Sequence, residues 1–215
     1  MSMTIKPVET TYAGYRFRSR LEARWAVFFD NLGLDWHYEP ETLSIPRTIS
    51  DMGRLGPFKY LPDFWLPELD LWAEVKGQWN AFEQLKALDA AAWLSGKDTG
   101  RCGEGADLLI LGQIPREHGH RVQSPWRLHM HDGELMRMPW ITNDLEPVQM
   151  GLHCDVADKA IRLGIDRRDV FGELGQQLLE GIHIWPCSPQ WYRKALANAR
   201  AARFEWGEFG GSRAA

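Results

Sequence analysis

Apolar side chains recur every three or four residues near the N-terminus, at Leu21, Trp25, Phe28, Phe29 and Leu32. This spacing predicts an amphipathic helix. Ser19 stands before the run and Gly33 after it, as expected for the two ends of a helix. The aromatic-rich residues 35–39 follow and predict a strand.

Two short β-like runs come next, residues 60–66 and 71–76, separated by a turn that contains Pro67. They predict an antiparallel hairpin. Residues 44–57, with their prolines and glycines, are expected to form a loop. A helix is expected over residues 80–94, and the continuous apolar run 106–112 is typical of a buried central strand. This order of elements favours an α/β fold, a mixed β-sheet flanked by helices.

The pattern weakens beyond residue 120. Residues 126–130 and 134–140 predict a second hairpin, residues 155–181 an interrupted helix, and residues 189–206 a helix rich in alanine and arginine. We therefore expect a core of residues 1–120 and a C-terminal, partly helical extension of residues 121–215.

Composition narrows the class of protein. The net charge is −4, which argues against a tight nonspecific coat of nucleic acid, because such proteins are usually basic. The three cysteines, Cys102, Cys154 and Cys187, are far apart and are expected to be reduced thiols. No signal peptide and no apolar run of about 18–20 residues is found, so we expect a cytoplasmic protein without a membrane span.

Asp63 and Glu74 lie equally far from the centre of the predicted hairpin turn. They are therefore expected to face each other, roughly 4.5–5.5 Å apart. Two carboxylates that close repel each other unless a cation lies between them, and Mg²⁺ is typically held by one or two carboxylates with phosphate oxygens and water. Lys76 shares the strand face of Glu74. Its ammonium there could stabilise a negatively charged transition state or help position the attacking water.

Two further candidates carry alternatives. Glu22 could complete the metal site from the first helix, but it lies three residues after Ser19, which is also the spacing of a capping box. Gln78 continues the strand face of Lys76 and could touch metal-bound water or a phosphate. Asp63 could instead be a strand-end residue, and Glu74 with Lys76 could form an ordinary solvated face.

Basic residues crowd the start of the first helix: Arg16, Arg18, Arg20 and Arg24. They are expected to hold backbone phosphates of nucleic acid, although a solvated helix face paired with local acids explains them as well. His118 with His120, and His129 with His131, could bind zinc from a strand. We do not favour zinc, because no cysteine lies near either pair.

Four runs of the sequence carry a family resemblance: YRFRSRLEARWAVFF, WHYEPE, YLPDF and WAEVKG, within residues 12–112. In this order they resemble the PD-(D/E)XK nuclease superfamily, also called restriction-endonuclease-like. They are most similar to its branch of phage-encoded endonuclease-like proteins and endonuclease subunits of some heteromeric transposases. The resemblance implies Mg²⁺ dependence, with Mn²⁺ as a substitute, and hydrolysis of phosphodiester bonds. It assigns Asp63 and Glu74 as metal ligands, Lys76 as the catalytic lysine and Glu22 as the helix-borne acid.

The sequence thus predicts a metal-dependent DNA endonuclease that either nicks DNA or is specific for a particular DNA structure. Expected partners are DNA and either a second copy of the chain or a larger phage or mobile-element assembly. The alternative is a catalytically idle protein of the nuclease fold that binds DNA or serves in assembly, with the C-terminal part as the interaction module. A nuclease that acts on RNA is a third hypothesis.

Overall fold

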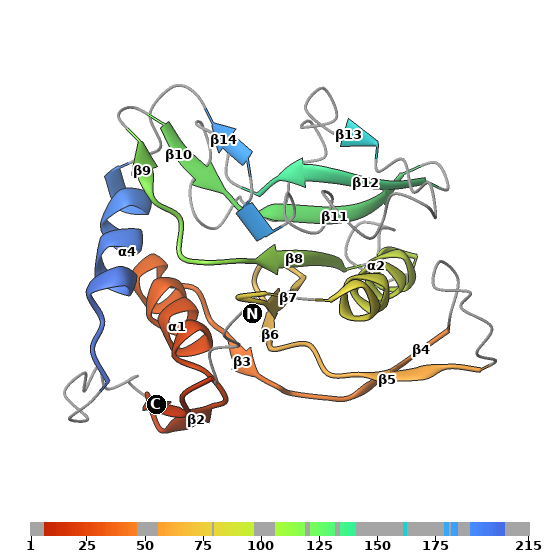
Figure 1. Cartoon of the computed structure of the whole chain (residues 1–215), viewed down its shortest axis with the longest axis horizontal. Coiled ribbons are helices and arrows are strands. Elements are labelled where there is room, and N and C mark those ends of the chain that lie inside the picture. The colour runs from red at the N-terminus through yellow and green to blue at the C-terminus, as the bar shows by residue number, and fades with distance from the viewer. Residues whose placement is uncertain are drawn as a thin grey trace, which may run out of the picture.

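The computed structural model describes residues 7–46, 56–78, 80–96, 106–118, 121–131, 134–140, 161–162, 179–180, 182–184 and 190–204. Its main sheet contains β3 (His37–Tyr38), β6 (Phe64–Leu66), β7 (Leu71–Val75), β8 (Asp107–Leu111), β11 (Trp126–His131), β12 (Glu134–Pro139) and β13 (Ile161–Arg162). The strand order is β13-β12-β11-β8-β7-β6-β3 (Figure 1). Strands β7 and β8 are parallel, whereas the other neighbours are antiparallel. The predicted mixed α/β architecture is confirmed.

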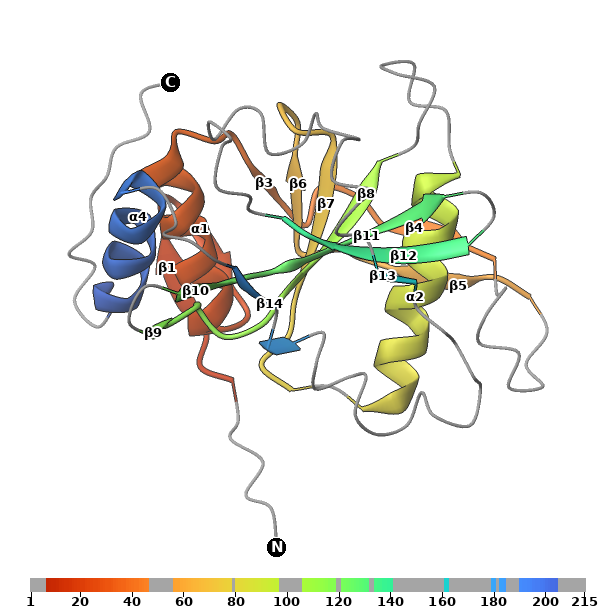
Figure 2. The same ribbon diagram turned by 90° about the horizontal axis from the view of Figure 1, so that it is seen from above.

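Helices cover both faces of this sheet. Helices α1 (Arg20–Leu32) and α4 (Gln190–Ala201) lie on one face, and α2 (Ala81–Ser95) lies on the other (Figure 2). Alternate residues of the central strands therefore enter two separate cores. Leu109 and Leu111 of β8 pack with α1 and α4, whereas Leu108 and Ile110 pack with α2. Within the described residues, no helix is long and apolar enough to cross a membrane.

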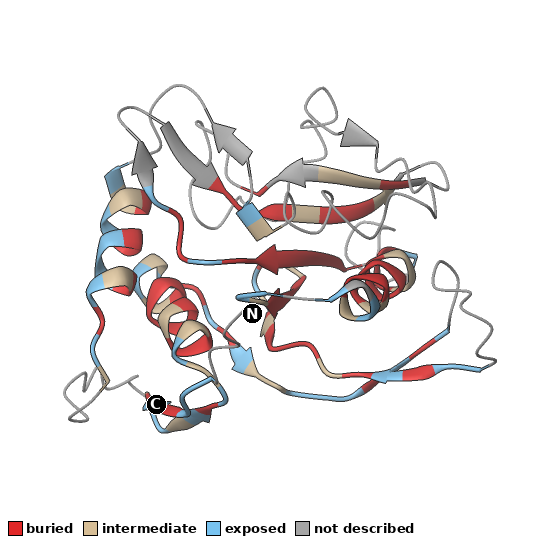
Figure 3. Cartoon of the chain, in the orientation of Figure 1, coloured by how far each residue is buried: buried red, intermediate tan, exposed pale blue. Residues whose placement is uncertain are grey.

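Helix α1 begins and ends where the sequence predicted. Ser19 is its N-cap and accepts a hydrogen bond from the backbone N of Glu22 at 3.2 Å. Gly33 ends the helix with φ 69°, in the left-handed region that glycine enters without strain. One side of the helix is buried (Figure 3). There, Trp25 Nε1 donates a hydrogen bond to the carbonyl of Gly112 at 2.9 Å and ties the helix to the end of β8.

The predicted loop at residues 44–57 is wrong at its start. Strand β4 (Leu43–Ile45) pairs there with β5 (Phe58–Tyr60), while residues 47–55 lie outside the described part of the chain. The cause is the alternation of buried and exposed residues in both strands, which gives the pair an apolar face. That face packs in the same core as α2.

Three further strands and a hairpin were not predicted. Strands β1 (Thr10–Tyr12) and β2 (Tyr15–Phe17) form a hairpin ahead of α1. Strands β9 (Glu117–His118), β10 (Arg121–Ser124) and β14 (Ile182–Ile184) form a separate small sheet. All five consist of two to four residues, too few for a clear alternation in the sequence.

The C-terminal region contributes to the same sheet and the same core as the N-terminal region. The predicted second hairpin is confirmed as β11 and β12, and the predicted last helix as α4. Of residues 155–181, the described pair 161–162 forms strand β13, paired with β12, so the predicted helix is wrong there, whereas the described pair 179–180 is helical as predicted. The three cysteines lie outside the described residues. Sheet and core both continue across residue 120.

The two helix C-caps allow a controlled test of backbone strain. Gly33→Ala would place a Cβ at φ 69° with no atom within 4 Å, so its cost is conformational alone. We expect a loss of about 1–2 kcal/mol in the free energy of unfolding, measured by urea denaturation. Gly96→Ala is the control, because Gly96 ends α2 in the right-handed region with φ −82°. Equal effects of the two substitutions would contradict the assignment of strain.

Candidate active site

The hairpin of β6 and β7 places Asp63 opposite Glu74. Phe64 pairs with Ala73, so Asp63 and Glu74 are the next pair in the same register. The register predicted from the symmetric turn is therefore confirmed. Both carboxylates are buried, with Asp63 2% and Glu74 5% exposed. Asp63 Oδ2 accepts a hydrogen bond from the backbone N of Val75 at 2.7 Å, which fixes this carboxylate against the neighbouring strand.

The two carboxylates interact electrostatically. Burial raises the pKa of Asp63 well above its usual range, and the negative charge of Glu74 raises it further. The positive charge of Lys76 acts in the opposite direction. A buried pair of like charges is unfavourable when both groups are ionised. Such a pair gains from any cation that binds close to it.

Lys76 lies beside Glu74, as the strand alternation predicted. Its Nζ is 2.8 Å from Glu74 Oε1. Burial alone would lower the pKa of this ammonium, but the charges of Glu74 and Asp63 outweigh burial and raise the pKa above its ordinary value. The side chain therefore carries a positive charge at neutral pH, which suits a role in stabilising negative charge.

One oxygen of Glu74 is poorly satisfied. Glu74 Oε2 and the hydroxyl of Tyr60 are both buried, and neither makes a hydrogen bond of normal geometry within the described structure, although the two side chains lie close enough to interact. An unsatisfied buried polar group costs roughly 1–3 kcal/mol, and more if it is charged. Burial, followed by the charge of Glu74, raises the pKa of Tyr60 and keeps it a neutral phenol. A divalent cation at Glu74 would give this oxygen a stronger partner than the Tyr60 hydroxyl, so these residues fit Mg²⁺.

The metal donors amount to a pair rather than a cluster. Among the residues that the structure describes, no group of three or more histidine, cysteine, aspartate or glutamate side chains is placed to hold a metal ion. A pair is still compatible with Mg²⁺, which is often held by one or two carboxylates while water and substrate phosphates complete its shell. It is a poor basis for Zn²⁺, which usually takes three or four protein ligands.

Glu22 is occupied by hydrogen bonds within the protein. Its Oε1 accepts from Ser19 Oγ at 2.6 Å, and its Oε2 accepts from the Tyr38 hydroxyl at 2.6 Å and from the backbone N of Arg18 at 3.0 Å. Ser19 caps the helix, but the Glu22 side chain bonds the Ser19 hydroxyl and not its backbone N, so only half of the capping box that the spacing allowed is formed. The charge of Glu22 also reaches Asp63, because it contributes to raising the pKa of that carboxyl. Its assignment as a metal ligand stays a prediction.

The four arginines that were predicted to act together lie in three different surroundings. Arg18 turns towards the site, where its guanidinium is 3.1 Å from Asp63 Oδ1 and also pairs with Glu39. Arg16 is an exposed side chain paired with Glu9. Arg20 and Arg24 line a pocket between α1 and the end of α4. The reason is helical geometry, because Arg20 and Arg24 are four residues apart on one face of α1.

The remaining candidates are not drawn into the site. Gln78 is an exposed residue beyond the end of β7. His129 is buried, and its Nδ1 lies 2.7 Å from Asp107 Oδ1, which gives it a place in a buried polar network. The side chains of His118, His120 and His131 fall outside what the structure describes.

Sequence reasoning missed three residues of the site: Tyr38, Glu39 and Tyr60. Each lies in a run that carries the family resemblance, WHYEPE or YLPDF. These runs could therefore have pointed to the three residues, and Tyr60 lies only three residues before Asp63 in the same run. Its contribution depends on the pairing of β5 with β4, which the sequence did not predict.

Comparison with known proteins leaves the site to be judged on its own geometry. No family model, curated protein or solved structure matches the chain.

Asp63→Asn should raise the stability of the protein when metal is absent. The substitution removes a buried acid next to Glu74, and the amide oxygen can still accept from the backbone N of Val75. The ion pair with Arg18 is lost as well, but it costs little because 58% of the Arg18 side chain is exposed. We expect an increase on the order of 1 kcal/mol, or about 2–4 °C in Tm, in buffer containing EDTA. Glu68→Gln, an exposed acid in the turn of the same hairpin, is the control and should leave Tm unchanged. A lower Tm for Asp63→Asn would argue against the repulsion.

Proposed function

We propose that the protein is an Mg²⁺-dependent nuclease that hydrolyses phosphodiester bonds in DNA. One observation carries the proposal: a buried carboxylate pair, Asp63 and Glu74, in which an oxygen of Glu74 makes no hydrogen bond of normal geometry in the described structure while Lys76 lies 2.8 Å from the other oxygen. An ordinary solvated strand face does not account for this arrangement, because both acids are buried, and burying charged groups is costly even when cations lie beside them.

Asp63 and Glu74 would hold the cation in this proposal. When bound, Mg²⁺ would polarise a phosphoryl oxygen and lower the pKa of a bound water. Both carboxylates are held in place without a substrate, Asp63 by the backbone N of Val75 and Glu74 by the ammonium of Lys76. Such preorganisation lowers the cost of reaching the transition state.

Lys76 and Arg18 would supply positive charge around the phosphate. The ammonium of Lys76 remains protonated beside Glu74, so it is suited to stabilising the charge that develops on the phosphoryl oxygens. Arg18 contacts Asp63 with its guanidinium, and 58% of its side chain is exposed. An arginine at the open side of a site can position a phosphate through two parallel hydrogen bonds.

A second function, DNA binding without hydrolysis, is favoured by one observation. The carboxylate of Glu22 already accepts three hydrogen bonds from the protein, so the third predicted acid is engaged elsewhere. A binding or assembly module would hold DNA equally well in EDTA and show no turnover. The following two experiments separate these functions.

Cleavage should depend on Glu74 and Lys76. With supercoiled plasmid, branched DNA and RNA as substrates and Mg²⁺ or Mn²⁺ present, we expect cleavage of DNA by the wild-type protein. Glu74→Gln and Lys76→Ala should each lower the rate by about 10²–10³-fold. The matched controls are Glu68→Gln and Lys59→Ala, which alter exposed residues of the same types and should retain the wild-type rate. Cleavage by Glu74→Gln at that rate would refute the assignment.

Binding of the cation should be measurable without any substrate. At an Mg²⁺ concentration about 100 times its dissociation constant, a site present only in the folded state adds about 2.7 kcal/mol of stability. We expect the Tm of the wild-type protein to rise as Mg²⁺ is titrated, and that of Glu74→Gln to stay level. An equal rise in both proteins would locate the cation elsewhere.

A further inference from the structure

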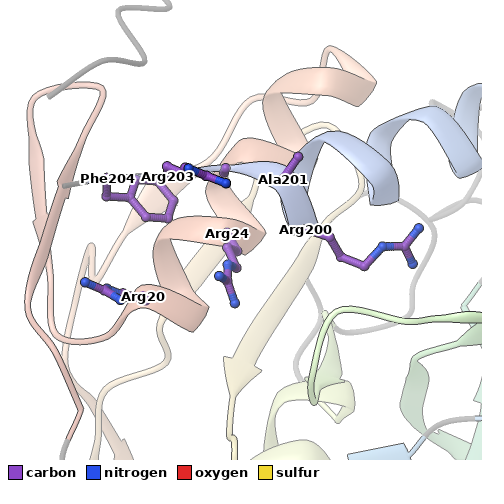
Figure 4. A pocket seen from close by; sticks show the side chains of 7 residues that line it. Arg20, Arg24, Arg200, Ala201, Arg203 and Phe204 are labelled. Carbon is purple, nitrogen blue, oxygen red and sulfur yellow. The ribbon is translucent and has the colours of Figure 1, made fainter. Parts of the chain in front are cut away.

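A pocket lined by arginines lies between two helices from opposite ends of the chain. Its volume is about 360 Å³, and its lining includes Arg20 and Arg24 of α1, Arg200 of α4, and Arg203 and Phe204 just beyond α4. Figure 4 shows these lining side chains, with Arg24 between Arg20 and Arg200 in that view. The pocket is separate from Asp63 and Glu74, since neither contributes to its lining.

Packing of α4 on α1 brings the four arginines together. Tyr192, Leu196 and Ala199 are buried in the core that α4 shares with α1. The ring of Tyr192 meets that of Phe28 edge to face, with centroids 5.7 Å apart. This apolar contact determines how the two helices lie, and the arginines project from their remaining surfaces.

The end of α4 is also anchored. Phe204 packs edge to face on Tyr12, with centroids 6.1 Å apart, and the Tyr12 hydroxyl donates to Asp30 Oδ2 at 2.7 Å. Because Phe204 follows Arg203 directly, this contact determines where Arg203 emerges. The guanidinium of Arg200 donates from one Nη to the carbonyl of Pro115, which fixes the end of that side chain at the edge of the pocket.

All charged side chains among the described residues that line the pocket are positive. No acidic side chain is among the described residues that line it. Arg24 Nε is buried and has no hydrogen-bond partner within the described structure. The N-terminal end of α1 adds a partial positive charge of the helix dipole on the same side. Four guanidinium groups line one pocket, and an anion bound there would offset their like charge.

We propose that this arginine pocket binds a phosphate group of a nucleic acid strand. Guanidinium groups match the oxygens of phosphate in pairs of parallel hydrogen bonds, which a cluster of arginines can supply from several directions. The inference rests on the proposed function, because it names the substrate contact that accompanies the candidate site. Arg18 contacts Asp63, and Arg20 begins the pocket two residues later. A strand passing the site would therefore reach the pocket within a few phosphates.

Binding should be measured by fluorescence anisotropy with a labelled single-stranded DNA in EDTA, so that no cleavage intervenes. Arg24→Gln and Arg203→Gln should each weaken binding by roughly 3–10-fold and reduce the slope of log K against log salt by about 0.7. Lys194→Gln is the matched control, because Lys194 is exposed on the same helix outside the pocket. Inorganic phosphate should compete with the DNA in the wild-type protein.

A second comparison tests whether the pocket binds a terminal phosphate or an internal phosphodiester. It uses four oligonucleotides of the same sequence, which carry either a phosphate or a hydroxyl at the 5′ end and either a phosphate or a hydroxyl at the 3′ end. Tighter binding of one phosphorylated end, lost in Arg203→Gln, identifies a terminal phosphate. Equal binding of all four, weakened in Arg203→Gln, identifies an internal phosphodiester. If Arg24→Gln and Arg203→Gln bind like Lys194→Gln, with the same salt slope, the pocket is not a phosphate site. Thermal melts of each variant verify that it is folded.

The pocket and the proposed function fail in different ways. If the wild-type protein does not cleave DNA but the arginine variants still bind it more weakly, the pocket stands and the nuclease proposal falls. If cleavage requires Glu74 but the arginine variants bind and cleave like Lys194→Gln, the pocket falls and the nuclease proposal stands.

Discussion

The antiparallel pairing of β6 with β7 is the constraint on which the candidate site depends. The register of the backbone hydrogen bonds places Asp63 opposite Glu74, although both are acids and both are buried. A shift by one residue would move each side chain to the opposite face. The apolar residues of the hairpin resist that shift, because Phe64 and Ala73 are fully buried in the core beneath α1. The stability of the core thus sustains an electrostatically unfavourable pair.

Helix α1 connects this pair with the rest of the molecule. Its first turn supplies Glu22 and lies next to Arg18, while the buried residues further along it pack on the sheet and on α4. Trp25 joins the helix to the end of β8 through a hydrogen bond to Gly112. The position of the site relative to the arginine pocket is therefore determined by one rigid helix rather than by loops.

Much of the fold could be predicted from the sequence because its strongest signals are local. The hairpin register follows from a symmetric turn, and the ends of α1 follow from Ser19 and Gly33. The pairing of β4 with β5 was missed because each strand has only three residues, too few for a clear alternation in the sequence, and residues 46–57 separate them.

The candidate site was predicted less completely for the same reason. Asp63, Glu74 and Lys76 belong to one hairpin, so their closeness could be worked out. Of the donors to Glu22, Ser19 was indicated by its spacing, whereas Tyr38 was not, because it reaches Glu22 from 16 residues away. Arginines that are neighbours in sequence were expected to act together, but the structure sends Arg18 to Asp63 and Arg20 to the pocket.

The packing of α1 against α4 also has a consequence for how the molecule is made. Residues 20–32 and 190–201 contact each other across more than half of the chain. Contacts between such distant segments form late in folding, because the chain must first lose the entropy of closing a long loop. During synthesis the hairpin with Asp63 and Glu74 emerges well before α4, and the four arginines meet only after the last helix has docked. A chain that ends before α4 would have the acids of the site but only half of the arginine pocket.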